Sequence, residues 1–494
     1  MKNWLVNVRR AGVPLVLLET FDAAQSIKSA ILSIGEKGGE TNFIEHDVVR
    51  GLVGSVLSIP GQMLAKEISP NGALDSGNPF EALSLLAKFS PQNSVIFIHS
   101  AHDILSQGPL CQAVWNLRDL FKASRSILVL LTPGCKVPEL LKYDVVTYME
   151  NPPSDKEIEQ IIDSICNDAG LVQDVESKRL ATNALKGLLT TFSVEQATAL
   201  SIQKTGLDLQ ALVNQRRAII SKTDGIEIRE DKTTFTEIAG YQPIKTRISR
   251  KIKGKKPPTL ILWLDEVREA FAGSQGDTSG VTQDQVGVLQ TWIQDRLNEG
   301  RFFGLFAVGF PGTSKSMLAA SLRNEANCEC IRLDLGAMKG SLVGESERKI
   351  RAVLKTIDAL TSGNILAIAT CNGLKGIPSP FISRFTGGTY FFDLPSPEEN
   401  SALWNIKRAK FSIPDTDLEP ESTGWTGREI HQCCASAEEL GISLLEASRD
   451  IAPFCKSNRS EIEELRAQAA GKWLSASSSG LYVQPSVATG RKIG

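Results

Sequence analysis

Two short stretches of the sequence carry residue types suited to phosphate chemistry. The first is GFPGTSKS at residues 309–316, where two glycines precede an adjacent lysine and serine. Glycines let such a loop curl so that its backbone N–H groups point at phosphate oxygens, and a following helix adds its positive N-terminal end. Lys315 is expected to reach the β- and γ-phosphates, and Ser316 to hold Mg²⁺. The predicted cradle comprises Gly309, Pro311, Gly312, Thr313, Ser314, Lys315, Ser316 and Met317.

The second stretch is a strand that ends in two acids. Residues 260–264 form a continuous apolar run, as expected for a central parallel strand, and Asp265 and Glu266 follow it directly. Asp265 is expected to hold Mg²⁺ through water, and Glu266 to polarise the attacking water. Taken alone, the pair also fits a plain turn at a strand end. Together with the glycine loop it predicts a nucleotide site.

Ser314 departs from the usual loop pattern, which has glycine at this position. If the backbone there requires a positive φ, a serine adds strain of about 1 kcal/mol. The sequence therefore predicts that Ser314 weakens nucleotide binding without abolishing it.

The elements that must position these residues alternate between strands and helices. Strands are expected at 260–264, 302–308, 330–333, 365–369 and 390–392, with helices between them. Ile350, Val353, Leu354, Ile357 and Leu360 share one helical face. This pattern predicts a doubly wound parallel α/β sheet. Residues 396–475 read as helices, opened by Ser396 as an N-cap.

The first half of the chain shows the same alternation without a glycine loop. Strands are expected at 13–18, 95–98 and 127–131, followed by mainly helical stretches at 156–169 and 175–207. The polar run 221–234 is typical of a linker. The predicted divisions are an α/β domain at 1–225, a second α/β domain at 226–395, a helical region at 396–475 and a flexible tail at 476–494.

Composition and charge narrow the class of protein. The chain has 494 residues, 42% apolar content and a net charge of −2, which suits a globular protein of two to four domains. No apolar run approaches the ~20 residues of a membrane helix, and the stretch 13–18 reads as a buried strand. The nine cysteines show no CxxC pair, which favours buried thiols in a reducing compartment. A cytoplasmic location is expected.

Three longer phrases carry a family resemblance. They are LDLGAMKGSLVGESE at 333–347, WLDE at 263–266 continuing to AFAG at 270–273, and FDLPSPEE at 392–399. Residues 235–440 resemble the AAA+ ATPase superfamily. They are most similar to the predicted AAA ATPases of cyanobacteria, plastids and some bacteriophages that are named for a hypothetical chloroplast reading frame. The resemblance implies ATP and Mg²⁺ as cofactors and a homo-oligomeric ring, typically a hexamer. It also implies that 226–395 is the ATPase core, that 396–475 is its helical lid, and that 1–225 is a degenerate ATPase-like α/β domain.

In that family the phosphate loop comes first and the acidic strand follows. Here the acidic strand precedes the loop by about 40 residues, and too few residues remain between 360 and 365 for a second copy. We therefore predict a segmental permutation of a working site. Parallel strands place their carboxyl ends at one edge of the sheet, so Asp265 is expected to lie beside Ser316 in the same sheet.

The resemblance assigns roles to further residues. Asn372 matches the sensor that orients the attacking water, and Arg384 matches the arginine finger that reaches the γ-phosphate of a neighbouring subunit. Arg428 falls at the second sensor position of the lid. The segment Ile238, Ala239 and Gly240 matches the adenine side. A solvated surface arginine is the alternative for Arg384 and for Arg428.

Two departures weaken parts of this assignment. The family often has a second arginine three residues after the finger, where this chain has Gly387. Leu342-Val343-Gly344 lies where threading enzymes carry an aromatic pore residue, and a plain loop is the alternative there.

The run of cations from Arg247 to Lys256 could contact a nucleic-acid backbone, although a solvated connector is the more usual role. The leading hypothesis is a Mg²⁺-dependent ATPase ring that remodels a macromolecular client. The alternatives are a nucleotide-gated scaffold with little turnover and a nucleic-acid remodelling ATPase. The sequence names no client and gives no indication of a membrane partner.

Overall fold

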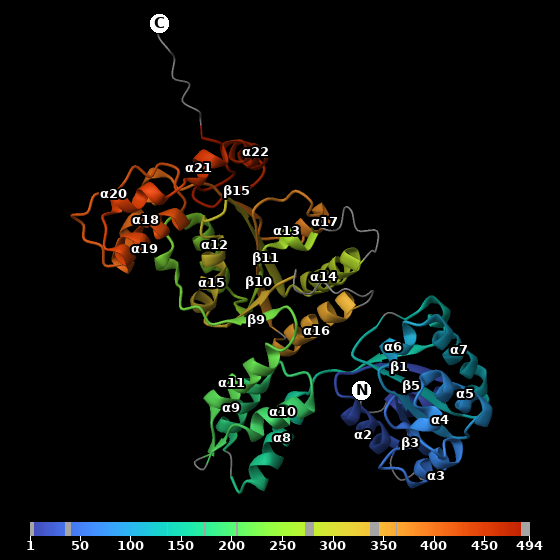
Figure 1. The fold of residues 1–494 in the computed structure, drawn as a ribbon. Helices are drawn as coiled ribbons and strands as arrows, with labels where there is room; N and C mark the ends of the chain where they lie inside the picture. The colour runs from blue at the N-terminus through green and yellow to red at the C-terminus, as the bar shows by residue number, and fades with distance from the viewer. Residues whose placement is uncertain are drawn as a thin grey trace. The chain divides into compact units, whose positions relative to one another are not determined.

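The computed structural model describes residues 4–34, 41–135, 137–171, 174–203, 206–271, 281–335, 345–361 and 363–485. These residues form two compact units (Figure 1). The first comprises residues 1–220 together with 347–360, and the second comprises residues 221–346 together with 361–494. The α/β class predicted from the alternating pattern is confirmed in both.

The first unit is built on a six-stranded sheet in the order β3-β2-β4-β5-β1-β6. Neighbouring strands are parallel except for β3, which is antiparallel to β2. The three predicted strands are confirmed as β1, β4 and β5, and every residue in them is buried. The pattern missed β2 and β6, which contain polar or exposed residues, and β3, which has only four residues with a glycine at each end. The strands are β1 (Leu15–Glu19), β2 (Asn42–Asp47), β3 (Gly51–Gly54), β4 (Ser94–Ile98), β5 (Ile127–Thr132) and β6 (Val146–Met149).

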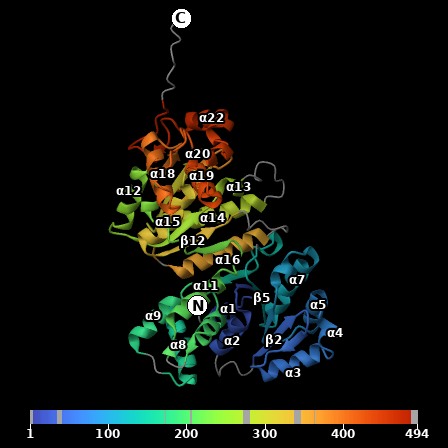
Figure 2. The ribbon, with the colours of Figure 1, turned by 60° about the vertical axis from the view of Figure 1, so that its left-hand side comes forward.

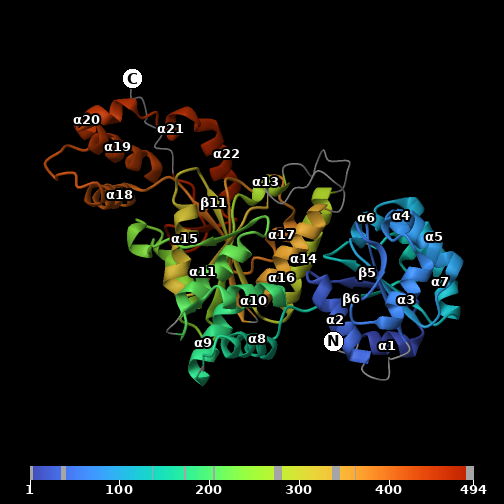
Figure 3. The ribbon, with the colours of Figure 1, turned by 60° about the horizontal axis from the view of Figure 1, so that its bottom comes forward.

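Helices cover both faces of this sheet because its central strands are apolar on both sides. Leu15 and Leu17 face a cluster that includes residues of α3, α5 and α7, whereas Val16 and Leu18 face α1 and α2. Figure 3 shows these two groups of helices on opposite sides of the sheet. The helices are α1 (Trp4–Ala11), α2 (Ala23–Ile34), α3 (Ile59–Ile68), α4 (Ala73–Ser76), α5 (Pro79–Phe89), α6 (Ala101–Leu105), α7 (Gly108–Ala123) and a 3-10 turn (Glu139–Leu141).

A helical group follows the first sheet. It consists of α8 (Asp155–Asp168), α9 (Val175–Leu185), α10 (Thr191–Ala199) and α11 (Leu209–Ile220). Ser154 caps α8 through a reciprocal bond with Glu157, the usual pairing of a serine N-cap with a glutamate three residues later. The stretch predicted to be helical to residue 207 ends instead in a short hairpin of β7 (Ile202–Gln203) and β8 (Gly206–Leu207).

Helix α16 (Glu345–Leu360) supplies the segment 347–360 of the first unit. Its predicted apolar face is confirmed, since Ile350, Val353, Leu354 and Ile357 are buried and Leu360 is half-buried. Lys355 pairs with Glu19 at 3.5 Å and lies over the ring of Phe21.

The second unit is built on a seven-stranded sheet in the order β15-β14-β11-β13-β10-β12-β9. All five predicted strands are confirmed, as β10, β11, β12, β13 and β14. The acidic strand β10 pairs in parallel with β13 and β12, so the prediction that it belongs to the sheet of the phosphate-loop strand β11 is confirmed. Its origin by permutation stays a prediction. The strands are β9 (Ile226–Arg229), β10 (Pro258–Leu264), β11 (Phe302–Gly309), β12 (Glu329–Leu333), β13 (Asn364–Cys371), β14 (Thr389–Phe392) and β15 (Leu474–Ser475).

The prediction that residues 221–234 form a linker is wrong for the middle of this segment. Residues 226–229 form β9, which runs antiparallel to β12 at the sheet edge. Ile226 is buried beside polar neighbours, a pattern too short to stand out in the sequence. The polar side chains suit an edge strand, which meets solvent on one side.

Helices cover the second sheet on both faces (Figure 1). Leu305 and Ala307 of β11 pack with α12 and α15, and Phe306 between them packs against Phe381 and Phe385 on the opposite face. The helices are α12 (Gln242–Ile252), α13 (Val267–Phe271), α14 (Val281–Asn298), α15 (Lys315–Ala326) and α17 (Ser379–Ile382).

The lid helices α18, α19 and α20 gather (Figure 2) around a separate core that contains Trp404 and Trp425. Helices α21 and α22 pack instead in a cluster with Phe310 and Phe391. The buried Trp404 donates its indole N–H to Ser422 at 2.9 Å. Ser396 and Thr426 cap α18 and α19 through reciprocal bonds with glutamates three residues later. The helices are α18 (Pro397–Lys410), α19 (Gly427–Leu440), α20 (Leu444–Ala447), α21 (Phe454–Ser457) and α22 (Arg459–Ala469).

The prediction of a flexible tail from residue 476 is wrong for residues 476–482. The chain turns at Gly471 and adds β15 beside β14. Ala476 and Tyr482 are buried, and the Tyr482 hydroxyl donates to Asp393 at 2.6 Å. These apolar contacts, hidden among serines and glycines in the sequence, hold the segment in place. Residues 486–494 lie outside the described part of the chain.

Among the described residues, no helix has both the length and the apolar character needed to cross a membrane.

Candidate nucleotide site

The glycine loop connects the end of β11 to the start of α15. Gly309 lies so close to β14 that an added Cβ would be 2.1 Å from the Phe392 carbonyl oxygen. Gly312 has φ +79°, and an added Cβ would meet Thr426 and Arg428 of the lid. Both positions therefore require glycine. Ser314 has φ +64°. This is the left-handed conformation in which we predicted that a serine would be strained.

Lys315 is buried at the start of α15. Its Nζ donates to the carbonyl oxygens of Gly309 and Phe310 at 2.8 and 2.6 Å. Burial lowers the pKa of Lys315 to about 8, because a charged amine loses its hydration there. Thr313 also donates to the Phe310 carbonyl, at 2.7 Å. The loop is thus held curled by its own side chains.

The two acids lie at the carboxyl end of β10, where parallel sheets bind ligands. Thr370 of β13 donates to one oxygen of Asp265 at 2.6 Å and accepts from the backbone N–H of Glu266. Arg332 of β12 donates to the other Asp265 oxygen from two nitrogens, at 3.0 and 2.8 Å. A third nitrogen of Arg332 binds Glu227 at 2.8 Å. Both oxygens of Asp265 are therefore engaged by neighbouring strands.

Glu266 is exposed and has φ +46°. A side-chain hydrogen bond with Glu269 raises its pKa, and burial and the charges of Glu269 and Asp265 act in the same direction. A carboxyl with a raised pKa is a stronger base than an ordinary one, which suits a group that accepts a proton from water.

These groups line one cavity of about 360 Å³. Eleven of the sequence-predicted site residues lie in its wall. They are Asp265, Glu266, Pro311, Gly312, Thr313, Ser314, Lys315, Ser316, Met317, Asn372 and Arg428. The loop, the ends of β10 and β13, and the lid thus meet at one place. Asp265 and Ser316 share this wall, and their joint role as metal ligands stays a prediction.

The segment predicted for the adenine side does not line the cavity. Ile238 is buried in the sheet core and Ala239 in the lid core. Gly240 has φ +68°, and an added Cβ would strike Glu399 of α18. The neighbouring Glu237 lines the cavity instead. The segment therefore joins the two cores beside the site.

Sequence reasoning missed several residues of the site. Arg332 and Thr370 lie in strands whose register the sequence does not reveal. The lid residues Leu403, Lys407 and Lys410 are spaced four and three residues apart on α18. This spacing, which places them on one face of the helix, is the sequence feature that could have indicated them. His431 of α19 lies with them in the cavity wall. Burial and the neighbouring lysines Lys407 and Lys410 lower the pKa of His431.

Arg384 lies apart from the described cavity wall. Its guanidinium donates to the Pro380 carbonyl, and its Nε is buried without a hydrogen-bond partner among the described residues. Gly387 leaves no room for the second arginine of the family pattern. An added Cβ there would be 2.5 Å from Leu305 and 2.7 Å from the Gly304 carbonyl.

The donor set at the cavity fits Mg²⁺. A hydroxyl from Ser316 and a carboxylate from Asp265 are oxygen ligands of the kind this ion prefers. Backbone N–H groups of the loop and the start of α15 suit phosphate oxygens. Residues 342–344, which lie where the family carries a pore loop, are outside the described residues.

This combination of a curled glycine loop, a buried lysine and two acids on a parallel sheet defines a P-loop nucleotide site. Residues 1–149 match the family model of the SpoVK-like AAA ATPase N-terminal domain, and residues 305–369 match that of the ATPase family associated with various cellular activities (AAA). The second match begins in β11, after the acidic strand.

Similar proteins align with most of the chain. The chain is 22% identical to the AAA domain-containing protein ycf46 of Guillardia theta, over 80% of this chain and 83% of that protein. The ycf46 protein of Pyropia yezoensis is also 22% identical, over 81% and 87%. That of Gracilaria tenuistipitata is 22% identical over 68% and 70%. The chain thus carries an AAA ATPase domain and is a P-loop ATPase.

Proposed function

We propose that the chain is a Mg²⁺-dependent ATPase that assembles into a ring, typically a hexamer, and uses ATP hydrolysis to remodel a macromolecular client. In this proposal each active site lies between two subunits. Movement of the lid helices against the sheet, driven by the nucleotide, transmits work to the client.

The chain's own residues divide the work of hydrolysis. The loop 309–316 holds the phosphates through backbone N–H groups, and Lys315 turns from the loop carbonyls to the β- and γ-phosphates. Asn372 orients the attacking water, and Glu266 takes its proton. Bound Mg²⁺, held by Ser316 and Asp265, supplies positive charge beside the phosphate oxygens. Arg428 brings a charge from the lid, so lid position depends on the nucleotide.

Arg384 is the observation that supports shared sites. It lies apart from the cavity that Lys315 and Asp265 line, and its guanidinium rests on a carbonyl of its own loop. A cation in that position can serve a nucleotide only if the nucleotide belongs to another subunit.

A mixing experiment tests the ring. Lys315→Ala removes the phosphate grip, and Arg384→Ala removes the proposed finger, so each variant alone should lose ATPase activity. In mixed rings, about a quarter of the interfaces combine an intact loop with an intact finger from the next subunit. We expect mixing to restore activity at those interfaces.

Lys375→Ala, an exposed lysine outside the cavity, is the matched control and should leave activity unchanged. If the Arg384→Ala variant hydrolyses ATP at the normal rate, or if mixing restores nothing while both variants co-assemble, the shared-site proposal fails.

Two observations favour a second candidate, a nucleotide-gated scaffold with little turnover. Ser314 adopts the strained left-handed conformation, and the guanidinium of Arg332 already binds the carboxylate of Asp265. Glu266→Gln separates the two candidates. In an ATPase it should slow turnover about 10²- to 10⁴-fold while ATP still binds. If the unaltered chain binds ATP without turnover, and Glu266→Gln changes nothing, the scaffold role is correct.

A further inference from the structure

The strongest unassigned charge in the second unit lies on α12 and the turn that follows it. Seven of the twelve residues from 245 to 256 are lysine or arginine, and no acidic residue occurs between Glu237 and Asp265. The whole chain carries a net charge of only −2. The positive charge of this segment is therefore a local concentration. The cations are Lys245, Arg247, Arg250, Lys251, Lys253, Lys255 and Lys256.

Six of these cations have no acidic partner among the residues that the structure describes. The seventh cation, Lys245, is buried and donates to the carbonyl oxygens of Phe235 and Ile238. Arg247 and Lys251 both lie over the ring of Phe303, at 5.6 and 5.5 Å. Burial and the nearby Lys256 lower the pKa of Lys251. An anion bound beside Lys251 would favour its charged form.

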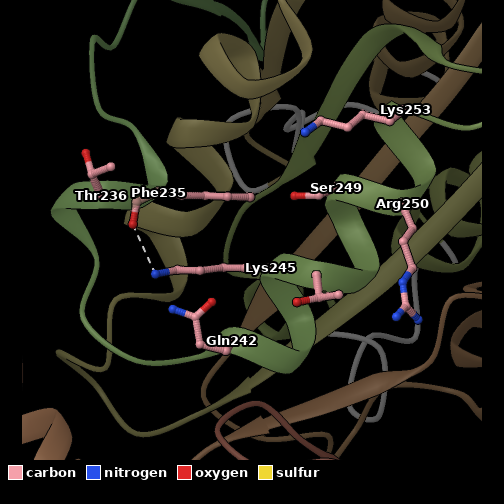
Figure 4. Close-up of a pocket in the computed structure, with 8 residues that line it drawn as sticks. Phe235, Thr236, Gln242, Lys245, Ser249, Arg250 and Lys253 are labelled. Carbon is pink, nitrogen blue, oxygen red and sulfur yellow. Dashed lines mark hydrogen bonds between the residues drawn. The ribbon is translucent and has the colours of Figure 1, made fainter.

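A surface hollow of about 490 Å³ lies beside this helix (Figure 4). Figure 4 shows the side chain of Phe235 reaching toward Ser249, with Arg250 and Lys253 on the same helix. The hydroxyls of Thr236, Thr246 and Ser249 and the amide of Gln242 supply neutral hydrogen-bonding groups. The wall consists of Phe235, Thr236, Gln242, Lys245, Thr246, Ser249, Arg250 and Lys253.

We propose that this face of α12 binds single-stranded nucleic acid, with phosphates on the exposed cations and a base in the hollow beside Phe235. Repeated cations along one helix match a ligand with repeated negative charge. An aromatic edge and hydroxyl groups next to those cations match a base attached to the phosphates. The proposal is independent of ATP hydrolysis, since it needs no residue of the nucleotide cavity.

Two other polyanions fit less well. An acidic peptide would neutralise the cations but would leave the aromatic and hydroxyl groups of the hollow without a role. A membrane surface would need apolar side chains beside the cations. The exposed residues of α12, which include Gln242, Thr246, Arg247 and Arg250, are polar.

The test uses the full chain and a fluorescein-labelled 20-nucleotide single-stranded DNA of mixed sequence, followed by fluorescence anisotropy. With about four phosphate contacts, log K should fall with log salt at a slope near −3. Arg250→Ala with Lys253→Ala should weaken binding about tenfold and reduce that slope by about 1.4. Both side chains are exposed, so the double variant should fold normally.

Lys375→Ala with Lys472→Ala removes two exposed lysines elsewhere in the second unit and should leave DNA binding unchanged. An abasic strand of the same length should bind more weakly than the DNA. The proposal is overturned if the two double variants bind alike, if the abasic strand binds as tightly, or if polyglutamate of equal charge displaces the DNA as effectively as unlabelled DNA does.

Discussion

Six strands of the second sheet repeat the arrangement of the first sheet, and among the described residues only the second unit carries a nucleotide loop. The series β6-β1-β5-β4-β2-β3 of the first unit corresponds to β14-β11-β13-β10-β12-β9 of the second. In both, the last strand is antiparallel to its neighbour. The chain enters the first sheet at β1 but visits β9 and β10 of the second before β11. Strand position in a sheet is thus independent of strand order along the chain.

The difference between the units lies in the connection after the corresponding strands β1 and β11. In the second unit five residues, 310–314, join β11 to α15, whereas three residues, 20–22, join β1 to α2. In that short turn Asp22 accepts from the backbone of Gln25, and Glu150 accepts from Thr20 and Ser26. Carboxylates take the place that phosphates would need, and they repel phosphate. A phosphate site therefore depends on the loop more than on the sheet.

The largest expected effect comes from removing the lysine of the nucleotide loop, which lies only in the second unit. Lys315→Ala should weaken nucleotide binding about 100-fold, since a lost charge-assisted bond costs up to about 3 kcal/mol. Titration calorimetry of the full chain with ATP and Mg²⁺ should give one site per chain before the change. Asp22→Ala, in the corresponding turn of the first unit, should leave binding intact. Two sites per chain, or a loss with Asp22→Ala, would show that the first sheet also binds nucleotide.

A pH titration should reveal the burial of Lys315. Its pKa of about 8 means that the folded, nucleotide-free chain carries the charge below pH 8 and loses it above. Because phosphate needs the protonated amine, affinity should fall as pH rises through 8, by about tenfold per unit. Lys315→Arg keeps its charge at these values and should give a flat profile. A fluorescent nucleotide analogue provides the measurement, and a flat profile for the unaltered chain contradicts this pKa.

The sequence revealed the interior of both sheets better than their edges. Central parallel strands such as β4 and β10 are uninterrupted apolar runs, because both faces are covered. The edge strands β9 and β15 are short and partly polar, so 221–234 read as a linker and the residues after 475 as a tail. Nothing local in either segment indicates the partner strand.

The same limit applies to the site. The glycine loop and the acidic pair are local patterns, and they predicted the residues that now line one cavity. Arg332 reaches Asp265 only because β12 lies beside β10 with Arg332 opposite Trp263, and a single sequence contains no record of that register. Lys407 and His431 reach the cavity through the lid's packing, which depends on Trp404 and its neighbours.

Arg332 allows a test of whether Asp265, at the end of β10, binds Mg²⁺. Its guanidinium competes with Mg²⁺ for Asp265, so Arg332→Gln should lower the Mg²⁺ concentration needed for tight nucleotide binding about fivefold. That is the effect of about 1 kcal/mol from a partly exposed ion pair. Arg332→Lys, which keeps the charge but loses the two-nitrogen contact, should fall between. The measurement is the binding of a fluorescent nucleotide at increasing Mg²⁺ concentrations. An unchanged or higher Mg²⁺ requirement in Arg332→Gln would show that Arg332 does not compete with Mg²⁺ for Asp265.

The smallest expected effect concerns the loop itself. Ser314 adopts φ +64°, where a side chain costs about 1 kcal/mol, and glycine regains only part of that because it loosens the unfolded chain. Ser314→Gly should therefore raise the free energy of unfolding of the second unit by about 0.5 kcal/mol. Ser314→Ala keeps the Cβ and removes the hydroxyl, so it should give no such gain. Denaturant melts with and without ATP compare the three chains. If alanine stabilises as much as glycine, the hydroxyl near the lid residue Gly427 is the source of the cost, and the backbone at position 314 is not strained.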